Sequence, residues 1–164
     1  MSEPYEMSAH DLTKAYRERN LTPRDVLESV LARMGIVEPT LNAFCARDDA
    51  AARLASDESS GRWASGAQLG DLDGVPISIK DLVDVAGFPT RYGSLPTDDS
   101  HSNNDAPCVV NLREEGAIIL GKTTTPEFGH KGVTDSPLTG VTRNPWDTDM
   151  TTGGSSGGAA AALA

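Results

Sequence analysis

The segment that most restricts the fold is GAIILGKT, residues 116–123, an apolar run that continues to a second glycine. An unbroken β-branched run of this length predicts a strand that is buried on both faces. Upstream, the segment VPISIK, residues 75–80, alternates apolar with other side chains. This alternation predicts a half-buried strand, and its Pro76 favours a sheet edge or the point where the chain enters the sheet.

Start signals for helices fill the first third of the chain. Either Ser8 or Thr13 is expected to cap a first helix that runs through Arg19. A second helix is predicted to begin after Thr22, because a proline follows at the first helical position and an aspartate at the third. Its apolar residues then recur with the helical period: Val26, Leu27, Val30, Leu31 and Met34.

Two further helices complete the pattern. An alanine-rich segment predicts a surface helix from about Arg47 to Ser60 that ends at Gly61. The segment DAPCVVNLREEG, residues 105–116, predicts a short helix between the two strands. Strands separated by helices indicate an α/β sheet whose faces are covered.

The charge balance excludes several classes of partner. Of the 164 residues, 24 are acidic and 14 are basic, which gives a net charge of −10. This charge disfavours binding to nucleic acid or to an anionic membrane surface. No segment is long and apolar enough to span a bilayer, and residues 1–12 lack the basic and apolar parts of a signal peptide.

The cysteines and histidines indicate a cytoplasmic protein without a metal site. Cys45 and Cys108 lie far apart and show no CxxC spacing, so reduced thiols are expected rather than a disulfide framework. The three histidines, His10, His101 and His130, are scattered as well, and zinc sites need clustered ligands.

The last stretch of the sequence, TGGSSGGAAAALA (residues 152–164), combines glycines, serines and alanines. By composition alone a glycine- and serine-rich run is a flexible linker. The alanines that follow favour a helix instead, with Ser155 or Ser156 at its cap. Neither a GxxxxGK[ST] phosphate loop nor a GxSxG nucleophile elbow is present here.

Four segments resemble the amidase signature family, in the family's order: LGDLDGVPISIKDLVDVAGFPTRYGS, GAIILGKTTTPEFG, GVTRNPWD and GGSSGGAAAALA. The resemblance covers nearly the whole chain. It implies an α/β fold with a mixed sheet flanked by helices. Residues 1–164 would form the N-terminal part of a single domain, mainly helical over residues 1–62 and with the start of the α/β core over residues 63–164.

The resemblance also implies a Ser-Ser-Lys catalytic triad. Lys80 matches the lysine, and Ser155 matches the serine that follows a cis peptide bond and shuttles a proton; Ser155 and the main chain near Gly129 would line the acyl pocket. Desolvation at a strand end can lower the pKa of a lysine enough to make it a base. In the alternative interpretation, Lys80 is a strand-end lysine that either extends to solvent or pairs with Asp81 or Asp84, and Ser155 is a plain helix cap.

Other parts of the resemblance concern the site's surroundings. The nucleophilic serine of the family lies about two dozen residues beyond the shuttling serine, so we expect the chain to be a fragment that lacks it and is inactive by itself. His130 and Lys131 are expected either to tune substrate choice or to lie on the surface. We expect Trp146 to pack against its neighbours.

For the full-length protein the resemblance implies hydrolysis of a small-molecule carboxylic amide, with no metal or organic cofactor; a homo-oligomer is compatible with it. One alternative is the A subunit of a glutamyl/aspartyl-tRNA amidotransferase, which frees ammonia from glutamine but usually carries Lys-Asp-Asn where this chain has Lys80, Asp81 and Leu82. A second alternative, from another class, is a catalytically inert binding or scaffold module.

Overall fold

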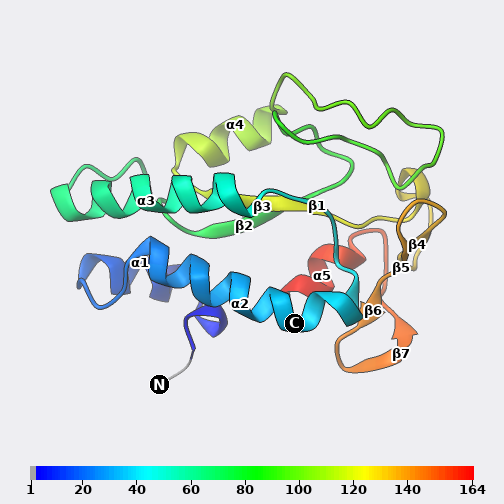
Figure 1. Ribbon diagram of the computed structural model, residues 1–164, viewed down its shortest axis with the longest axis horizontal. Helices are drawn as coiled ribbons and strands as arrows, with labels where there is room; N and C mark the ends of the chain where they lie inside the picture. Colours follow the sequence, from blue (N-terminus) through cyan, green and yellow to red (C-terminus); the bar gives the residue numbers. More distant parts are fainter. Residues whose placement is uncertain (1–2) are drawn as a thin grey trace. The chain divides into compact units, whose positions relative to one another are not determined.

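The computed structural model describes residues 3–164 (Figure 1). The helices are η1 (Pro4–Glu6), α1 (Ala9–Arg17), α2 (Pro23–Leu41), α3 (Asp49–Ser65), α4 (Pro107–Glu114), η2 (Glu127–Gly129) and α5 (Gly157–Leu163). The strands are β1 (Phe44–Arg47), β2 (Pro76–Lys80), β3 (Ile118–Thr123), β4 (Asp135–Ser136), β5 (Gly140–Val141), β6 (Arg143–Asn144) and β7 (Asp147–Thr151).

The chain divides into two compact units. The first comprises the described residues up to Ile36 together with Asp48–Ile77 and Pro107–Leu120. The second comprises Val37–Arg47, Ser78–Ala106 and Gly121–Ala164. The division falls within α2, β2 and β3, so each unit is described by itself.

The first two helices begin at the predicted caps. Ser8 Oγ accepts a hydrogen bond from Asp11 N, and Thr22 Oγ1 accepts one from Asp25 N while the Asp25 carboxylate accepts from Thr22 N. These bonds satisfy amide groups that a helix leaves free at its start. The end predicted for α1 is wrong by two residues: α1 ends at Arg17, because Arg19 has a φ of 60°, which no helix contains.

The third helix differs from the prediction at both ends. It begins after Asp48, whose carboxylate accepts from Ala51 N, and it passes through Gly61 to end at Gly66. Gly66 has the left-handed φ of 75° that terminates a helix, and its N–H bonds to the Arg62 carbonyl. The residues before α3 form β1, a half-buried strand of four residues that is too short to show a period.

The three-stranded sheet has the order β1-β3-β2 and is mixed. β1 runs antiparallel to β3. β2 runs parallel to β3, because Ile118 N bonds to Val75 O near one end of the pair and Asp81 N bonds to Thr123 O at the other. The α/β class is therefore confirmed, as are the edge position of β2 and the complete burial of β3.

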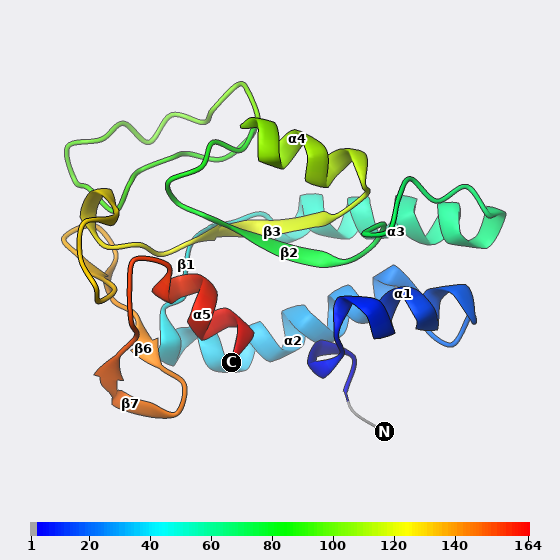
Figure 2. The ribbon, with the colours of Figure 1, turned by 180° about the vertical axis from the view of Figure 1, so that it is seen from behind.

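Each unit has its own apolar cluster. In the first unit, the cluster consists of residues from α1, α2 and α3: Leu12, Tyr16 and Val26, with Met7, Leu21, Val30 and Trp63 packed against them. In the second, the end of α2 packs beside α5 (Figure 2), through Leu41, Ala43 and Ala161 with Val37 and Phe44. The second cluster therefore holds the helix that follows the glycine- and serine-rich segment.

The segment before that helix is more regular than the sequence suggests. Instead of a plain loop, β4 pairs with β5 and β6 pairs with β7, both antiparallel. Trp146 lies at the turn between β6 and β7 and is 84% exposed, so the prediction that it packs against its neighbours is wrong. The short strands pair with each other, which leaves the turn residue in solvent. Among the helices described for residues 3–164, none has the length and apolarity to cross a membrane.

Candidate active site

The end of β2 and the start of α5 bring Lys80 and Ser155 together within the second unit. Lys80 Nζ donates hydrogen bonds to Ser155 Oγ at 2.6 Å and to Ser156 Oγ at 3.0 Å. The two serines lie 75 and 76 residues from the lysine along the chain. Tertiary structure therefore assembles one amine and two hydroxyls in a single cluster.

The segment GGSSGG is held in place and is not a flexible linker. Ser155 O accepts from Thr125 Oγ1 at 3.1 Å, and Gly157 N donates to Thr134 Oγ1 at 3.1 Å. A Cβ atom on Gly157 would overlap Thr134 Oγ1 and Thr152 Oγ1. Close packing therefore requires glycine at position 157. The peptide bond between Gly154 and Ser155 is cis.

Ser156, rather than Ser155, occupies the N-cap position of α5. Its hydroxyl makes no capping bond to the helix and accepts from Lys80 instead. The interpretation of Ser155 as a plain helix cap is therefore wrong. Sequence analysis missed the contact between Lys80 and Ser156, because two adjacent serines do not show which of them faces a distant strand.

Burial lowers the pKa of the Lys80 amine from its ordinary value. Desolvation has this effect because it disfavours the charged form. Among the contacts of the described residues, the Lys80 amine reaches only the hydroxyls of Ser155 and Ser156, and the ion pair of Asp81 is with Lys122. The alternative in which Lys80 pairs with Asp81 or Asp84 is therefore wrong.

Asp81, the residue after Lys80, is anchored by a buried ion pair. Its Oδ1 accepts from Lys122 Nζ and from Arg91 N, both at 3.2 Å. Lys122 is fully buried and also donates to Pro89 O and Thr90 Oγ1. The buried ion pair of Lys122 was not predicted from the sequence. The available signal was a lysine inside an otherwise apolar strand, because a buried lysine needs a buried partner.

Gly129 lies beside Ser155, in η2. A Cβ on Gly129 would be 3.7 Å from Ser155 Oγ and 2.8 Å from Leu82 Cδ1, so the Gly129 backbone packs against Leu82. Its φ of 68° also favours glycine. The structure thus brings three residues named from the sequence, Lys80, Gly129 and Ser155, to one place.

The neighbours of Gly129 in this loop, Phe128, His130 and Lys131, are exposed. Phe128 is 62% exposed and stacks on Tyr92, with ring centroids 6.2 Å apart. Sequence analysis missed this aromatic pair, whose members are far apart along the chain. His130 and Lys131 are exposed, and Lys131 pairs with Asp135 at 2.7 Å. In the described chain neither contacts the Lys80 cluster, which favours the surface interpretation of both.

Asp81 also lines a small pocket in the second unit. It has a volume of about 280 Å³ and is lined in part by Cys45 and Asp81. Burial and the nearby Asp81 carboxylate raise the pKa of the Cys45 thiol to about 12, so this thiol stays protonated at neutral pH. Across residues 3–164, no group of three histidine, cysteine, aspartate or glutamate side chains could hold a metal ion.

Comparison with known proteins identifies the family. The family model described as Amidase matches residues 25–164. The chain belongs to the amidase family. Its lysine and serine cluster, Lys80 with Ser155 and Ser156, lies within the residues that the family model matches.

Individual relatives of this amidase-family chain include different kinds of enzyme. It is 44% identical over 160 residues, 98% of its length, to the indoleacetamide hydrolase of Bradyrhizobium diazoefficiens, of which it covers 30%. Over 164 residues it is 37% identical to the A subunit of the glutamyl-tRNA(Gln) amidotransferase of Acidothermus cellulolyticus, of which it covers 32%.

A solved bacterial aryl acylamidase of the amidase signature family has the same fold, with a TM-score of 0.86, 31% identity and coverage of 94% of this chain and 32% of that one. The chain thus spans about a third of the length of the relatives that it matches.

Proposed function

We propose that the protein hydrolyses a small-molecule carboxylic amide to an acid and ammonia or an amine. The observation that carries this proposal is the 2.6 Å hydrogen bond between Lys80 Nζ and Ser155 Oγ, next to a Lys80 amine whose pKa burial lowers. A neutral amine can accept a proton from a hydroxyl, whereas an ammonium cannot. Membership of the amidase family supports the reaction class.

In the proposed reaction Ser155 relays a proton between Lys80 and an attacking serine that the 164 residues do not include. Ser155 takes the proton of that serine and passes its own to Lys80 while the serine oxygen adds to the amide carbon. The relay then runs in reverse and protonates the departing nitrogen, which leaves an ester on the serine. Water enters by the same relay and releases the acid. The route uses only hydroxyl and amine groups, so it needs no metal or organic cofactor.

The site's surroundings agree with this assignment of roles. Gly129 packs close enough to Ser155 to place its main chain along the acyl part of a substrate. Ser156 Oγ also accepts from Lys80, and we assign it the role of holding the amine toward Ser155. We further propose a cytoplasmic location, since both cysteines of the structure, Cys45 and Cys108, are free.

A second candidate function is release of ammonia from glutamine, as in the tRNA amidotransferases. The 37% identity to the corresponding amidotransferase chain over all 164 residues favours it. Against it stands Leu82, an apolar residue packed on Gly129 where those chains usually carry asparagine.

The test compares two substrates with the gene product at its natural length. We expect it to release ammonia from an arylacetamide and not from glutamine, with Ser155→Ala as the control that removes the relay. Turnover of glutamine alone would contradict the hydrolase proposal and support the amidotransferase function. Turnover of neither substrate by a folded protein would support an inert binding module.

A further inference from the structure

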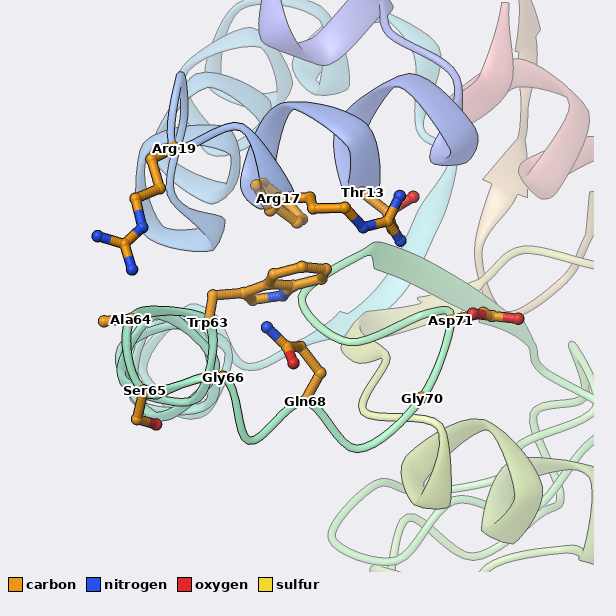
Figure 3. A pocket seen from close by; sticks show the side chains of 11 residues that line it. Thr13, Arg17, Arg19, Trp63, Ala64, Ser65, Gly66, Gln68, Gly70 and Asp71 are labelled. Carbon is orange, nitrogen blue, oxygen red and sulfur yellow. The ribbon is translucent and has the colours of Figure 1, made fainter.

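The first unit contains a pocket of about 590 Å³ between the ends of α1 and α3 (Figure 3). Figure 3 shows Arg17 and Arg19 on opposite sides of the Trp63 ring, so their guanidinium groups do not meet at one ligand. The pocket has no lining residue in common with the Lys80 cluster. The side-chain partners described for that cluster all lie in the second unit.

In the second unit, Thr134 holds the chain on both sides of the two serines of the cluster. Its Oγ1 donates a hydrogen bond to Gly153 O at 3.0 Å and accepts one from Gly157 N at 3.1 Å. A threonine hydroxyl is both a donor and an acceptor, so one group can make both bonds. Thr134 is fully buried, which strengthens them.

The main chain supports the same attachment. Gly154 N donates to Gly132 O at 2.8 Å, and Thr134 N donates to Thr152 O at 3.2 Å. The segment before the serines is therefore paired with the loop that carries Thr134, and a shift of either one moves the other.

The two serines pass this attachment on to Lys80. Lys80 Nζ donates to Ser155 Oγ at 2.6 Å and to Ser156 Oγ at 3.0 Å. Both serines lie between Gly153 and Gly157, the two residues that the Thr134 hydroxyl binds. The distance from Lys80 Nζ to Ser155 Oγ therefore depends on the Thr134 hydroxyl.

We propose that Thr134 is a positioning residue, whose hydroxyl sets the place of Ser155 Oγ against Lys80 Nζ. The inference rests on the proposed function, in which Ser155 and Lys80 exchange a proton. Such a transfer needs hydrogen-bond distances between the reacting groups. A displacement of about 1 Å in a reacting group costs roughly 10²-fold in rate.

Thr152 provides the matched control for Thr134. Both side chains are buried, and a Cβ on Gly157 would overlap both hydroxyls. Within residues 3–164, however, Thr152 Oγ1 has no hydrogen-bond partner. Valine at either position makes the same change of shape beside Gly157, but only at Thr134 does it remove hydrogen bonds.

The first measurement is amide turnover by the gene product at its natural length. Thr134→Val should lower kcat roughly 10- to 100-fold and leave KM within about twofold, because the role concerns the relay and not substrate binding. Thr134→Ser keeps the hydroxyl and should recover most of the rate, and Thr152→Val should leave kcat nearly unchanged. In a Ser155→Ala background, Thr134→Val should have little further effect, because Thr134 acts through Ser155.

The second measurement does not depend on turnover. Acetic anhydride labels lysine amines, and mass spectrometry compares Lys80 with the exposed Lys14 of the same protein. Thr134→Val should raise the relative labelling rate of Lys80 roughly 2- to 10-fold, the change in population that one hydrogen bond represents. Thr152→Val should leave this rate unchanged.

Four results would overturn the proposal. These are equal effects of Thr134→Val and Thr152→Val on kcat, a loss that Thr134→Ser does not recover, a loss of full size in the Ser155→Ala background, or unchanged labelling of Lys80. If the unaltered protein turns over no amide, the hydrolase proposal fails, and the labelling of Lys80 alone decides whether Thr134 positions Ser155. If Thr134→Val does not fold, Thr134→Ala replaces it beside Thr134→Ser, because these two differ only in the hydroxyl.

Discussion

Lys80 and Lys122 show how one residue type takes two roles in the same unit. Lys122 is fully buried, but a carboxylate, a carbonyl and a hydroxyl surround its ammonium group. Lys80 is half-buried, and its hydrogen bonds reach only hydroxyls. Because Asp81 forms its ion pair with Lys122, no carboxylate of the described residues pairs with Lys80, and burial can lower the pKa of the Lys80 amine.

The relay predicts non-additive effects of substitution at Lys80 and Ser155. Lys80→Met in the protein at its natural length should lower kcat/KM roughly 10²- to 10⁴-fold, because general base catalysis has this magnitude. Ser155→Ala should fall in the same range, and the double variant should be little worse than either single one. Lys131→Met, at an exposed lysine outside the cluster, is the control and should keep nearly full activity. Losses that multiply as independent factors would rule out a shared relay.

The lowered pKa of Lys80 predicts a direction for the pH dependence. Only the neutral amine can take a proton, and its fraction rises with pH, so kcat/KM should increase with pH. The midpoint of this limb should lie below 10.5, the ordinary value for lysine, because burial lowers the pKa. Lys80→Arg should abolish the limb, since a guanidinium stays protonated. A pH profile unchanged by Lys80→Arg would assign the titration to another group.

The buried ion pair between Lys122 and Asp81 predicts that substitution of Lys122 lowers the stability of the protein strongly. Lys122→Met leaves the buried Asp81 carboxylate without its cation and should lower the free energy of unfolding by about 3–5 kcal/mol, measured by urea denaturation. Adding Asp81→Asn should recover part of this loss, because the uncompensated charge is then absent. Lys14→Met, which breaks an exposed pair with Glu18 at 3.9 Å, should cost less than about 1 kcal/mol. Equal costs for Lys122→Met and Lys14→Met would mean that the Lys122 pair contributes little.

The surroundings of glycine differ between two helices, being crowded at Gly158 in α5 and open at Gly61 in α3. In α5, a Cβ on Gly158 would lie 2.6 Å from Ala43 O and overlap Thr124. In α3, Gly61 has no atom within 4 Å of such a Cβ. Close packing therefore requires Gly158, while α3 only tolerates Gly61.

Alanine substitutions at Gly158 and Gly61 should change the stability of the protein in opposite directions. Gly158→Ala should destabilise the protein by about 1–3 kcal/mol or more through overpacking against backbone atoms. Gly61→Ala should stabilise it by about 0.5–1 kcal/mol, because alanine loses less backbone entropy in a helix. Thermal unfolding followed by circular dichroism measures both. A neutral Gly158→Ala would show that α5 can shift away from β3.

In the molecule as a whole, the amine and hydroxyls of the candidate site all lie within the second unit. The proposed chemistry needs a nucleophile in addition to Lys80 and Ser155, and the proposal assigns to these two residues a proton relay. The proposed roles of Ser155 and Ser156 are proton transfer and orientation, and neither role requires an acyl ester on these serines.

Because the proposed relay needs a further nucleophile, we predict that the 164-residue chain by itself shows no amide turnover. It should also resist labelling by a serine-directed fluorophosphonate, measured by mass spectrometry of the peptide that contains Ser155 and Ser156. The gene product at its natural length, under the same conditions, is the positive control. Rapid labelling of Ser155 in the 164-residue chain would make Ser155 the nucleophile and overturn the relay.

The sequence by itself determined the local elements and the family. Caps at Ser8 and Thr22, the buried run of β3 and the half-buried strand β2 depend on neighbours along the chain, so periodicity and cap chemistry predict them. By resemblance, the GGSSGG segment also named Ser155, and the segment with VPISIK named Lys80, as candidate site residues.

Tertiary structure decided which of these groups meet. The end of α3, the strand β1, the exposure of Trp146 and the burial of Lys122 all depend on partners far away in the sequence. The same is true of Ser156, whose hydroxyl faces Lys80 only because α5 is packed on Ala43 and Leu41. Local propensity carries no information on such contacts, since they form only when distant segments are brought together.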